Sequence, residues 1–260
     1  MIVIVLQIFF ALAVIVLIIL FVFQPKRKSF AFLITEEHKQ LLADYVKFYQ
    51  QLDENGRKKF EKRVEQFLSS VKITGANAEL EDVDRILIGA AAIIPVYFIT
   101  DWQYINLHEV LVYPGNFNHD FEQHGGDRSI SGMVGTGGLQ NVMIISKWEM
   151  RQGFISQGYR NTAIHEFIHL IDKMDGTVDG VPELLLPRKF VPQWRQLIDS
   201  EIQKIRRGES DIDPYAATNA AEFFAVVSEY FFEMPELFRQ NHPALNDMLE
   251  KIFLRKDSER

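Results

Sequence analysis

The most uniform hydrophobic pattern of the chain lies at its N-terminus. Residues 2–23 are apolar apart from Gln7, and none of them is charged. With a rise of about 1.5 Å per helical residue, such a run is long enough to span a bilayer. A secretory signal would instead combine a basic start, a shorter apolar core and a cleavage site of small residues. The pattern therefore predicts a transmembrane anchor over residues 1–24.

A short basic cluster follows this apolar run. Lys26, Arg27 and Lys28 stand directly after it, and flanking cations favour the cytoplasmic side of a membrane. We therefore expect a single-pass protein of the inner (cytoplasmic) membrane, which contacts the lipid bilayer through residues 2–23 and has its remaining chain in the cytoplasm. Residues 25–35 are predicted to be a basic juxtamembrane linker.

The remaining chain alternates between patterns typical of helices and of strands. Apolar residues at helical spacing predict two helices over 36–71 with a turn at 53–57, and these should pack on the core of the following domain. The apolar run within 82–98 predicts a buried helix that is too short to be a second span. Other patterns predict strands at 110–113 and 141–146 and helices at 190–206, 219–233 and 242–253. We expect one α+β domain over 36–260, mainly helical with a small sheet, with a helical N-terminal part at 36–72.

One predicted helix carries a candidate metal site. Residues 165–169 read His-Glu-Phe-Ile-His, and side chains at i and i+4 share one helix face. His165 and His169 could therefore bind one metal ion, with Glu166 as a general base beside it. Asn161 or Thr162 could cap this helix, and Asp175-Gly176 would end it. Two core histidines bonded to backbone carbonyls are the alternative, but this reading leaves Glu166 unexplained.

A catalytic zinc site needs a third protein ligand. Asp175 stands ten residues after His165, but the longer motif that uses this position needs Gly where the chain has Asp172. Asp172 is better interpreted as a partner of a ligand histidine. Glu222 and Glu229 are stronger candidates, because a carboxylate within so apolar a helix needs a positive partner unless it faces solvent.

These segments resemble a known family. The stretches 108–115, 164–172, 175–182 and 215–232 are similar to the Mlc titration factor A family of bacterial zinc peptidases, and the likeness covers about residues 80–240, the expected catalytic core. The catalytic region of that family is similar to that of anthrax lethal factor. The resemblance implies a zincin-like metallopeptidase domain.

The resemblance also implies a role for each site residue. One Zn²⁺ ion would be bound by His165, His169 and Glu222, which leaves Glu229 as a group that supports a ligand. Tyr215, seven residues before Glu222, would face the metal and donate a hydrogen bond to the developing oxyanion. Glu166 would take a proton from the water that zinc activates and pass it to the leaving amine.

The glycine-rich segment 125–138 lies between the two predicted strands. Its glycines are not spaced as a phosphate-binding loop. A zincin presents an edge strand beside its active-site helix, so this segment is either a mobile loop or bulged edge near the cleft, or a plain connection. His119 and His124 nearby are interpreted as surface histidines rather than metal ligands.

Composition narrows the function further. The chain has no cysteine, which suits a reducing compartment, and its formal net charge of −7 argues against a nucleic-acid partner. The leading hypothesis is a membrane-anchored zinc metallopeptidase acting on peptides or proteins. The alternative is a regulatory binding protein that sequesters a cytoplasmic partner such as a transcriptional repressor, as the family name suggests. The intact set of site residues disfavours a scaffold with a degenerate site.

Overall fold

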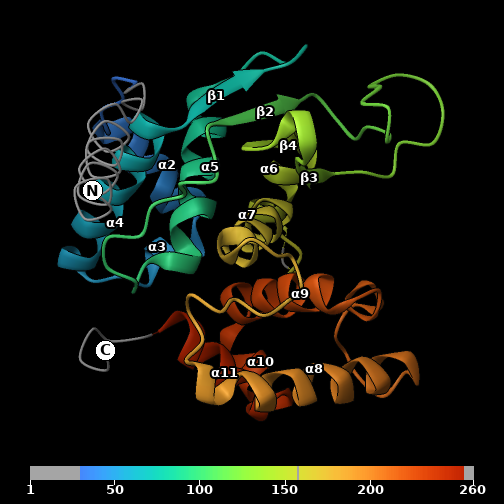
Figure 1. Ribbon diagram of the computed structural model, residues 1–260. Coiled ribbons are helices and arrows are strands. Elements are labelled where there is room, and N and C mark those ends of the chain that lie inside the picture. The colour runs from blue at the N-terminus through green and yellow to red at the C-terminus, as the bar shows by residue number, and fades with distance from the viewer. Residues whose placement is uncertain (1–29, 157, 255–260) are drawn as a thin grey trace, which may run out of the picture.

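The computed structural model describes residues 30–156 and 158–254 of the 260-residue chain. Helices predominate, and four short strands form a single sheet at one edge of the molecule (Figure 1). The chain order is α2 (Glu36–Tyr45), α3 (Lys47–Gln50), α4 (Glu54–Ser70), β1 (Lys72–Gly75), α5 (Asp82–Ile93), β2 (Glu109–Tyr113), β3 (Gly132–Val134), β4 (Val142–Ser146), α6 (Lys147–Ile155), α7 (Thr162–Asp172), α8 (Val191–Arg206), α9 (Ala220–Glu233), α10 (Pro235–Asn241) and α11 (Pro243–Phe253). Short 3₁₀ turns include η1 (Ile94–Val96), η2 (Gly137–Leu139), η3 (Lys173–Asp175), η4 (Arg188–Phe190) and η5 (Pro214–Ala217).

The sheet is mixed and has the order β1-β2-β4-β3. β2 pairs in parallel with β1 and β4, whereas β3 pairs antiparallel with β4. Side chains alternate between the two faces, so that Met143 and Ile145 of β4 enter the main core while Ile144 lies in a small outer cluster with Tyr113 and Phe117. The predicted strands at 110–113 and 141–146 are confirmed as β2 and β4.

The N-terminal helices pack on the buried helix α5. Nine residues of α5 are buried, and both α2 and α4 contact it. The predicted pair of helices differs in detail: the first breaks at Val46, and Asp53 caps α4 by accepting a hydrogen bond from the amide of Gly56. The predicted turn at 53–57 is therefore largely the first turn of α4.

Beyond the sheet, α7 lies between α5 and α9, and α9 is in turn covered by α8, α10 and α11 (Figure 1). The side chain of Asn219 caps α9 by accepting a hydrogen bond from the amide of Glu222, and Pro235 follows the end of the helix. This arrangement places one face of α7 against α9. These two helices carry the candidate ligands.

The membrane prediction needs correction. Within the described residues, no helix is both long and apolar enough to cross a bilayer. The largely buried helix α5 has 12 residues and begins with acidic groups, so it is a core helix. The expected span at 2–23 lies outside the described residues. The finding contradicts the predicted fold with a leading transmembrane helix, and it contradicts the predicted single-pass location. The bilayer is therefore withdrawn as a partner. The observed fold is mainly helical with a small mixed sheet.

Candidate metal centre

Helix α7 carries the His-Glu-Phe-Ile-His motif and has a capped N-terminus. The side chain of Asn161 caps it by accepting a hydrogen bond from the amide of Ile164, at 3.2 Å. Ile164, Ile168 and Ile171 are buried and hold one face of the helix against the core. The helix ends at Asp172, and η3 then leads to Gly176, which adopts a left-handed conformation with φ of 103°. The predicted cap at Asn161 is confirmed, whereas the α-helix ends three residues before the predicted stop at Asp175-Gly176, with η3 between them.

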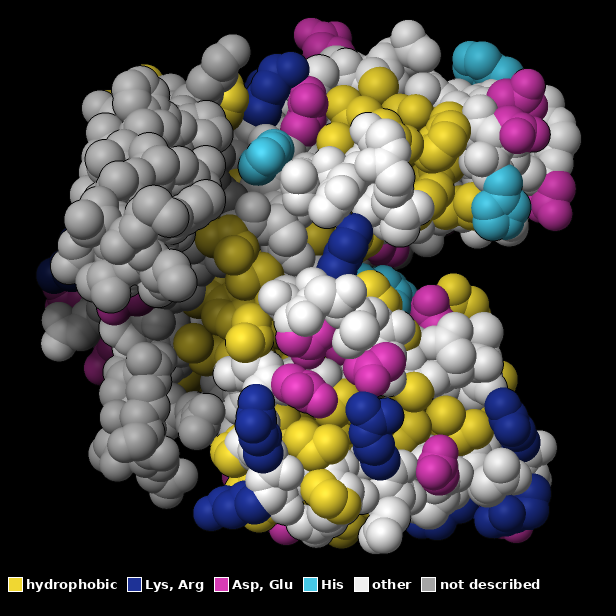
Figure 2. Space-filling view, viewed as in Figure 1, with side chains coloured by type: hydrophobic (Ala, Val, Ile, Leu, Met, Phe, Trp, Pro, Cys, Tyr) yellow, Lys and Arg dark blue, Asp and Glu magenta, His cyan; other side chains and the backbone are white. Residues whose placement is uncertain are grey.

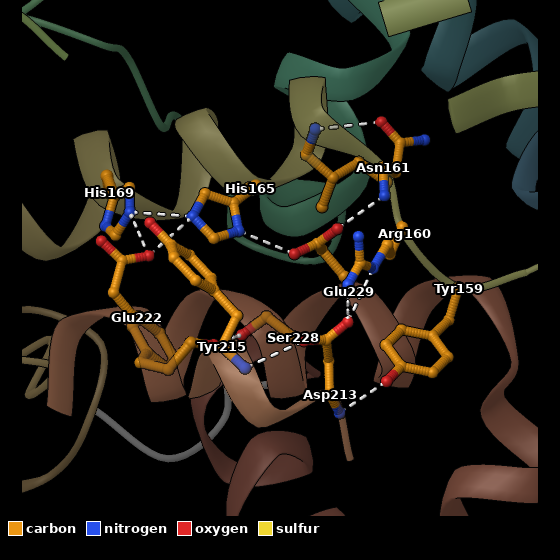
Figure 3. Close-up of polar contacts among 12 residues, drawn as sticks. Tyr159, Arg160, Asn161, His165, His169, Asp213, Tyr215, Glu222, Ser228 and Glu229 are labelled. Carbon is orange, nitrogen blue, oxygen red and sulfur yellow. Dashed lines mark hydrogen bonds and ion pairs between the residues drawn. The ribbon is translucent and has the colours of Figure 1, made fainter. Parts of the chain in front are cut away.

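Three candidate ligand atoms converge between α7 and α9 (Figure 3). The Nε2 atoms of His165 and His169 are 3.0 Å apart, and Oε2 of Glu222 lies 3.0 Å from the first and 3.4 Å from the second. Since tetrahedral zinc has bonds of about 2.0–2.1 Å, its ligand atoms lie roughly 3.4 Å from one another. The spacing of the three atoms therefore suits a small tetrahedral cation.

The protonation pattern supports the same conclusion. Oε1 of Glu229 lies 2.7 Å from Nδ1 of His165, a contact in which Nδ1–H donates. The Nε2 lone pair of a neutral His165 then faces the carboxylate of Glu222, which is unfavourable without a cation between them. Burial lowers the pKa of His165, but Glu229 and Glu222 outweigh it and raise the pKa well above its ordinary value. The residues present thus form a site that attracts positive charge.

Glu166 lies beside these ligands with its carboxylate buried. Burial is the main cause of its raised pKa, which the two histidines oppose. Gly132 of β3 lies against this side chain so closely that a Cβ atom there would be 2.5 Å from Oε1 of Glu166. The glycine-rich segment therefore does contribute an edge strand next to α7, although its three-residue length and its glycines gave no strand pattern in the sequence.

Glu229 of α9 connects His165 to the N-terminus of α7, the helix on which His165 lies. Besides contacting His165, it accepts a hydrogen bond from the amide of Asn161 through Oε2, at 2.5 Å. Asn161 donates from its side chain to Glu233, which also pairs with Lys47 at 3.7 Å. One carboxylate from α9 thus fixes both the N-cap residue of α7 and the ring of His165.

Asp172 and Asp175 make other contacts. Oδ2 of Asp172 accepts a hydrogen bond from the amide of Gly180, and burial raises the pKa of its carboxyl to about 7. Oδ1 of Asp172 and Nδ1 of His169 are both buried without a partner among the described residues. A role for Asp172 in orienting His169 therefore stays a prediction. Asp175 instead accepts hydrogen bonds from Thr177 and Glu183 and does not join the ligand cluster.

Tyr215 stands at the mouth of the site on η5. Its ring centroid lies 6.1 Å from that of His165, and half of the residue is exposed. Burial, followed by the nearby carboxylate of Glu222, raises its pKa, so the phenol stays protonated at neutral pH. Asp213 holds this turn by accepting a hydrogen bond from the amide of Tyr215, and it also pairs with Arg160 (Figure 3). No local pattern in the sequence indicates Arg160 or Asp213 as site residues, because their pairing joins segments 53 residues apart.

The ligand cluster lies in a cleft with a pocket on each side. Gly132, His165, Glu166 and Tyr215 line both pockets, whose volumes are about 500 and 620 Å³. Arg160 and His119 line the first pocket, and Lys173 and Asp179 line the second. Figure 2 shows the molecular surface hollowed between the part that holds the sheet and the part that holds α8 to α11, with a histidine side chain in the hollow. Both histidines interpreted as surface residues, His119 and His124, are exposed, and His119 also lines the first pocket.

Together, the fold and site define a mainly helical protein with a small mixed sheet and a cluster of two histidines and one glutamate that could hold a metal ion. Residues 23–254 match the family model described as glucose-regulated metallo-peptidase M90. The chain therefore belongs to this metallo-peptidase family.

Several relatives have similar sequences over most of their length. The uncharacterized protein slr2042 of Synechocystis is 31% identical over 82% of this chain and 82% of its own length. Mlc titration factor A of Escherichia fergusonii is 34% identical over 70% of this chain and 72% of its own. Mlc titration factor A of Salmonella paratyphi B is 31% identical over 75% and 78%, respectively. The resemblance to the Mlc titration factor A family is thereby confirmed.

Proposed function

We propose that the protein is a zinc-dependent peptidase in which His165, His169 and Glu222 hold one Zn²⁺ ion. The observation that carries this proposal is the convergence of three ligand atoms within 3.0–3.4 Å of one another beside the buried carboxylate of Glu166. Membership of a metallo-peptidase family supports it. The similarity to the catalytic region of anthrax lethal factor stays a prediction.

Each of the protein's own groups has a role in this reaction. When bound, zinc would supply Lewis acidity, which lowers the pKa of water and polarises a peptide carbonyl. Glu166 would accept a proton from the attacking water and deliver it to the leaving amine; its raised pKa brings it nearer to the range of an effective general base. Tyr215, protonated at neutral pH, would donate a hydrogen bond to the oxyanion. Glu229 would hold the ring of His165 in the orientation that presents Nε2.

The substrate would lie along the cleft. Among the described residues, β3 is the last strand of the sheet and pairs only with β4, so an extended peptide could pair with its other edge. The two pockets would then accept side chains on either side of the bond to be cleaved. This arrangement favours a peptide or an extended protein segment as the substrate class.

Metal analysis together with two variants tests the proposal. The purified full-length protein should contain about one zinc per chain, and His165→Ala should lose it. Glu166→Gln keeps all three ligands, so it should retain zinc and lose hydrolysis of internally quenched peptides. Absence of zinc from the wild type, or full zinc content in His165→Ala, would overturn the proposal.

A regulatory binding protein is the second candidate, favoured by the relatives named Mlc titration factor A. Such a protein would sequester a cytoplasmic partner, for example a transcriptional repressor, and hydrolysis would be secondary. Glu166→Gln separates the two functions. A sequestering protein keeps its effect on gene expression in this variant, whereas a peptidase that acts by cleavage loses it.

A further inference from the structure

A cavity outside the cleft lies on the opposite side of α7 from the metal centre. It has a volume of about 530 Å³, within the usual range for small-molecule sites, and lies between α4 and the segment after η1. Phe67 and Tyr104 line it, and their rings pack on Phe167 with centroid distances of 5.5 and 5.2 Å. Phe167 follows Glu166 and projects about 200° around the helix from His165. The cavity is therefore separate from the cleft.

Three cations line this cavity from one face of α4. Lys59, Lys62 and Arg63 are spaced three and four residues apart, and the one carboxylate in the lining is that of Asp101. Lys62 makes no hydrogen bond or ion pair with any described residue. Nζ of Lys59 lies 4.9 Å from the ring centroid of Tyr97. The lining thus has an excess of positive charge, although the whole chain is acidic.

Arg63 is the most constrained of these cations. Its Nη1 atom donates to the carbonyls of Val96 and Tyr97, at 2.6 and 2.8 Å, and fixes the guanidinium against the wall. Burial lowers its pKa, and the nearby charge of Asp101 offsets this only in part, since no carboxylate of the described residues lies within 4.0 Å of the guanidinium. A partly buried charge without an ionic partner is costly, and an anion in the cavity would stabilise it.

The remaining wall mixes aromatic and other side chains: Phe67, Trp102 and Tyr104 lie among Gln66, Ser70, Ile93, Thr100 and Gln103. Trp102 packs edge-on against Tyr104 with a centroid distance of 6.0 Å, and its Nε1 atom is buried without a hydrogen-bond partner among the described residues. The cavity therefore combines aromatic side chains with cations on one side.

We propose that this cavity binds a small molecule that carries a phosphate group on a flat apolar body. The phosphate would lie against Lys62 and Arg63, because an arginine and a lysine side by side suit its several acceptor oxygens. The apolar body would lie against Trp102 and Tyr104. The same chemistry could come from a soluble phosphate ester or from the headgroup of a lipid.

Calorimetric titration of the full-length protein with phenyl phosphate at low salt tests the proposal. Saturable binding is expected, and Lys62→Gln should weaken it about fivefold or more, in keeping with loss of one close charge. Lys58→Gln is the matched control, because Lys58 lies on the same helix, pairs with Glu54 and does not line the cavity. Lys62 has no described polar contact to lose, so its substitution should leave the fold intact. Equal affinity of Lys62→Gln and wild type overturns the proposal.

Vesicles of phosphatidylcholine with and without phosphatidic acid distinguish the two sources. A lipid source predicts stronger binding to the vesicles with phosphatidic acid, and a Lys62→Gln protein should lose that increment. A soluble source predicts that phosphatidic acid increases vesicle binding equally in the wild type and in Lys62→Gln. It also predicts that the binding of phenyl phosphate depends on Lys62. If neither probe shows a dependence on Lys62, the cavity is a solvated basic surface and the proposal fails.

Discussion

Gly132 and Glu166 are in direct contact although they belong to an edge strand and a helix. A Cβ atom at Gly132 would lie 2.5 Å from Oε1 and 2.7 Å from Cγ of Glu166. Such distances are far below van der Waals contact, so no residue larger than glycine fits beside the carboxylate in its present position. The edge strand therefore determines where the candidate general base sits.

Substituting Gly132 should impair hydrolysis without removing the metal. In Gly132→Ala, the carboxylate of Glu166 must move while the three ligand atoms stay in place, and displacement of a catalytic group by about 1 Å can lower the rate about 100-fold. Peptide hydrolysis and zinc content, measured on the same preparation, check this. Gly138→Ala is the control, because a Cβ there meets no atom within 4 Å. Full activity in Gly132→Ala would contradict the prediction.

Removing the charge of Glu229 should weaken metal binding. The carboxylate accepts hydrogen bonds from Nδ1 of His165 and from the amide of Asn161. In Glu229→Gln, one acceptor oxygen becomes an N–H donor that must face one of these donors. Loss of such a supporting hydrogen bond lowers metal affinity about 10- to 100-fold, which competition with a zinc chelator would measure. Glu236→Gln, at an exposed position on α10, should bind zinc like the wild type.

Tyr215→Phe should slow the chemical step. The substitution keeps the ring next to His165 but removes the hydroxyl that would donate to the oxyanion, and loss of such a donor costs about 100- to 1,000-fold in kcat. Zinc content should not change, since His165, His169 and Glu222 all stay in place. Steady-state kinetics with one cleaved peptide provide the measurement. A change in KM alone would show that Tyr215 binds substrate without acting on the oxyanion.

Asp211 should make folding sensitive to acid. Burial alone would raise the pKa of its carboxyl, but hydrogen bonds with Tyr230, Asn241 and His242 outweigh burial and lower it. Because the folded pKa is lower than the unfolded one, the stabilisation is present above the ordinary aspartate pKa of about 3.9 and is lost as the pH falls through the folded value.

Urea unfolding of the wild type and Asp211→Asn across this range measures the effect. At pH 6, the wild type should be more stable by on the order of 1 kcal/mol, a modest value because the carboxylate is partly exposed. The difference should shrink in acid. A difference that is independent of pH would rule out the carboxylate charge as its source.

The sequence predicted the helices and strands whose apolar pattern matches their burial in the fold. β2 and β4 are five residues long and rich in branched apolar residues, and α5 is almost wholly apolar. β1 and β3 escaped prediction, because each is three or four residues long and is stabilised mainly by pairing with its neighbour in the sheet. The break at Val46 likewise has no glycine or proline to mark it.

Only the site residues that lie together on one helix could be predicted from their spacing in the sequence. His165, Glu166 and His169 share α7, so their spacing alone placed them together. For the third ligand, the helical pattern of α9 left Glu222 and Glu229 equivalent. Their separation depends on how α9 packs: Glu222 reaches the Nε2 atoms, and Glu229 reaches Nδ1 of His165 from the other side. The contact with Gly132 involves a residue 34 positions away and leaves no trace in the sequence.

The carboxylate of Glu229 couples folding of the chain to assembly of the ligand set. It completes the N-terminal end of α7 through Asn161 and orients His165, so the same docking of α9 that stabilises the fold also assembles the ligand set. The unfolded chain has no such arrangement, and any ion bound here favours the folded state by mass action. The melting temperature should therefore rise with free zinc concentration and fall when a chelator is added, so that a thermal melt reports how much of the protein is loaded.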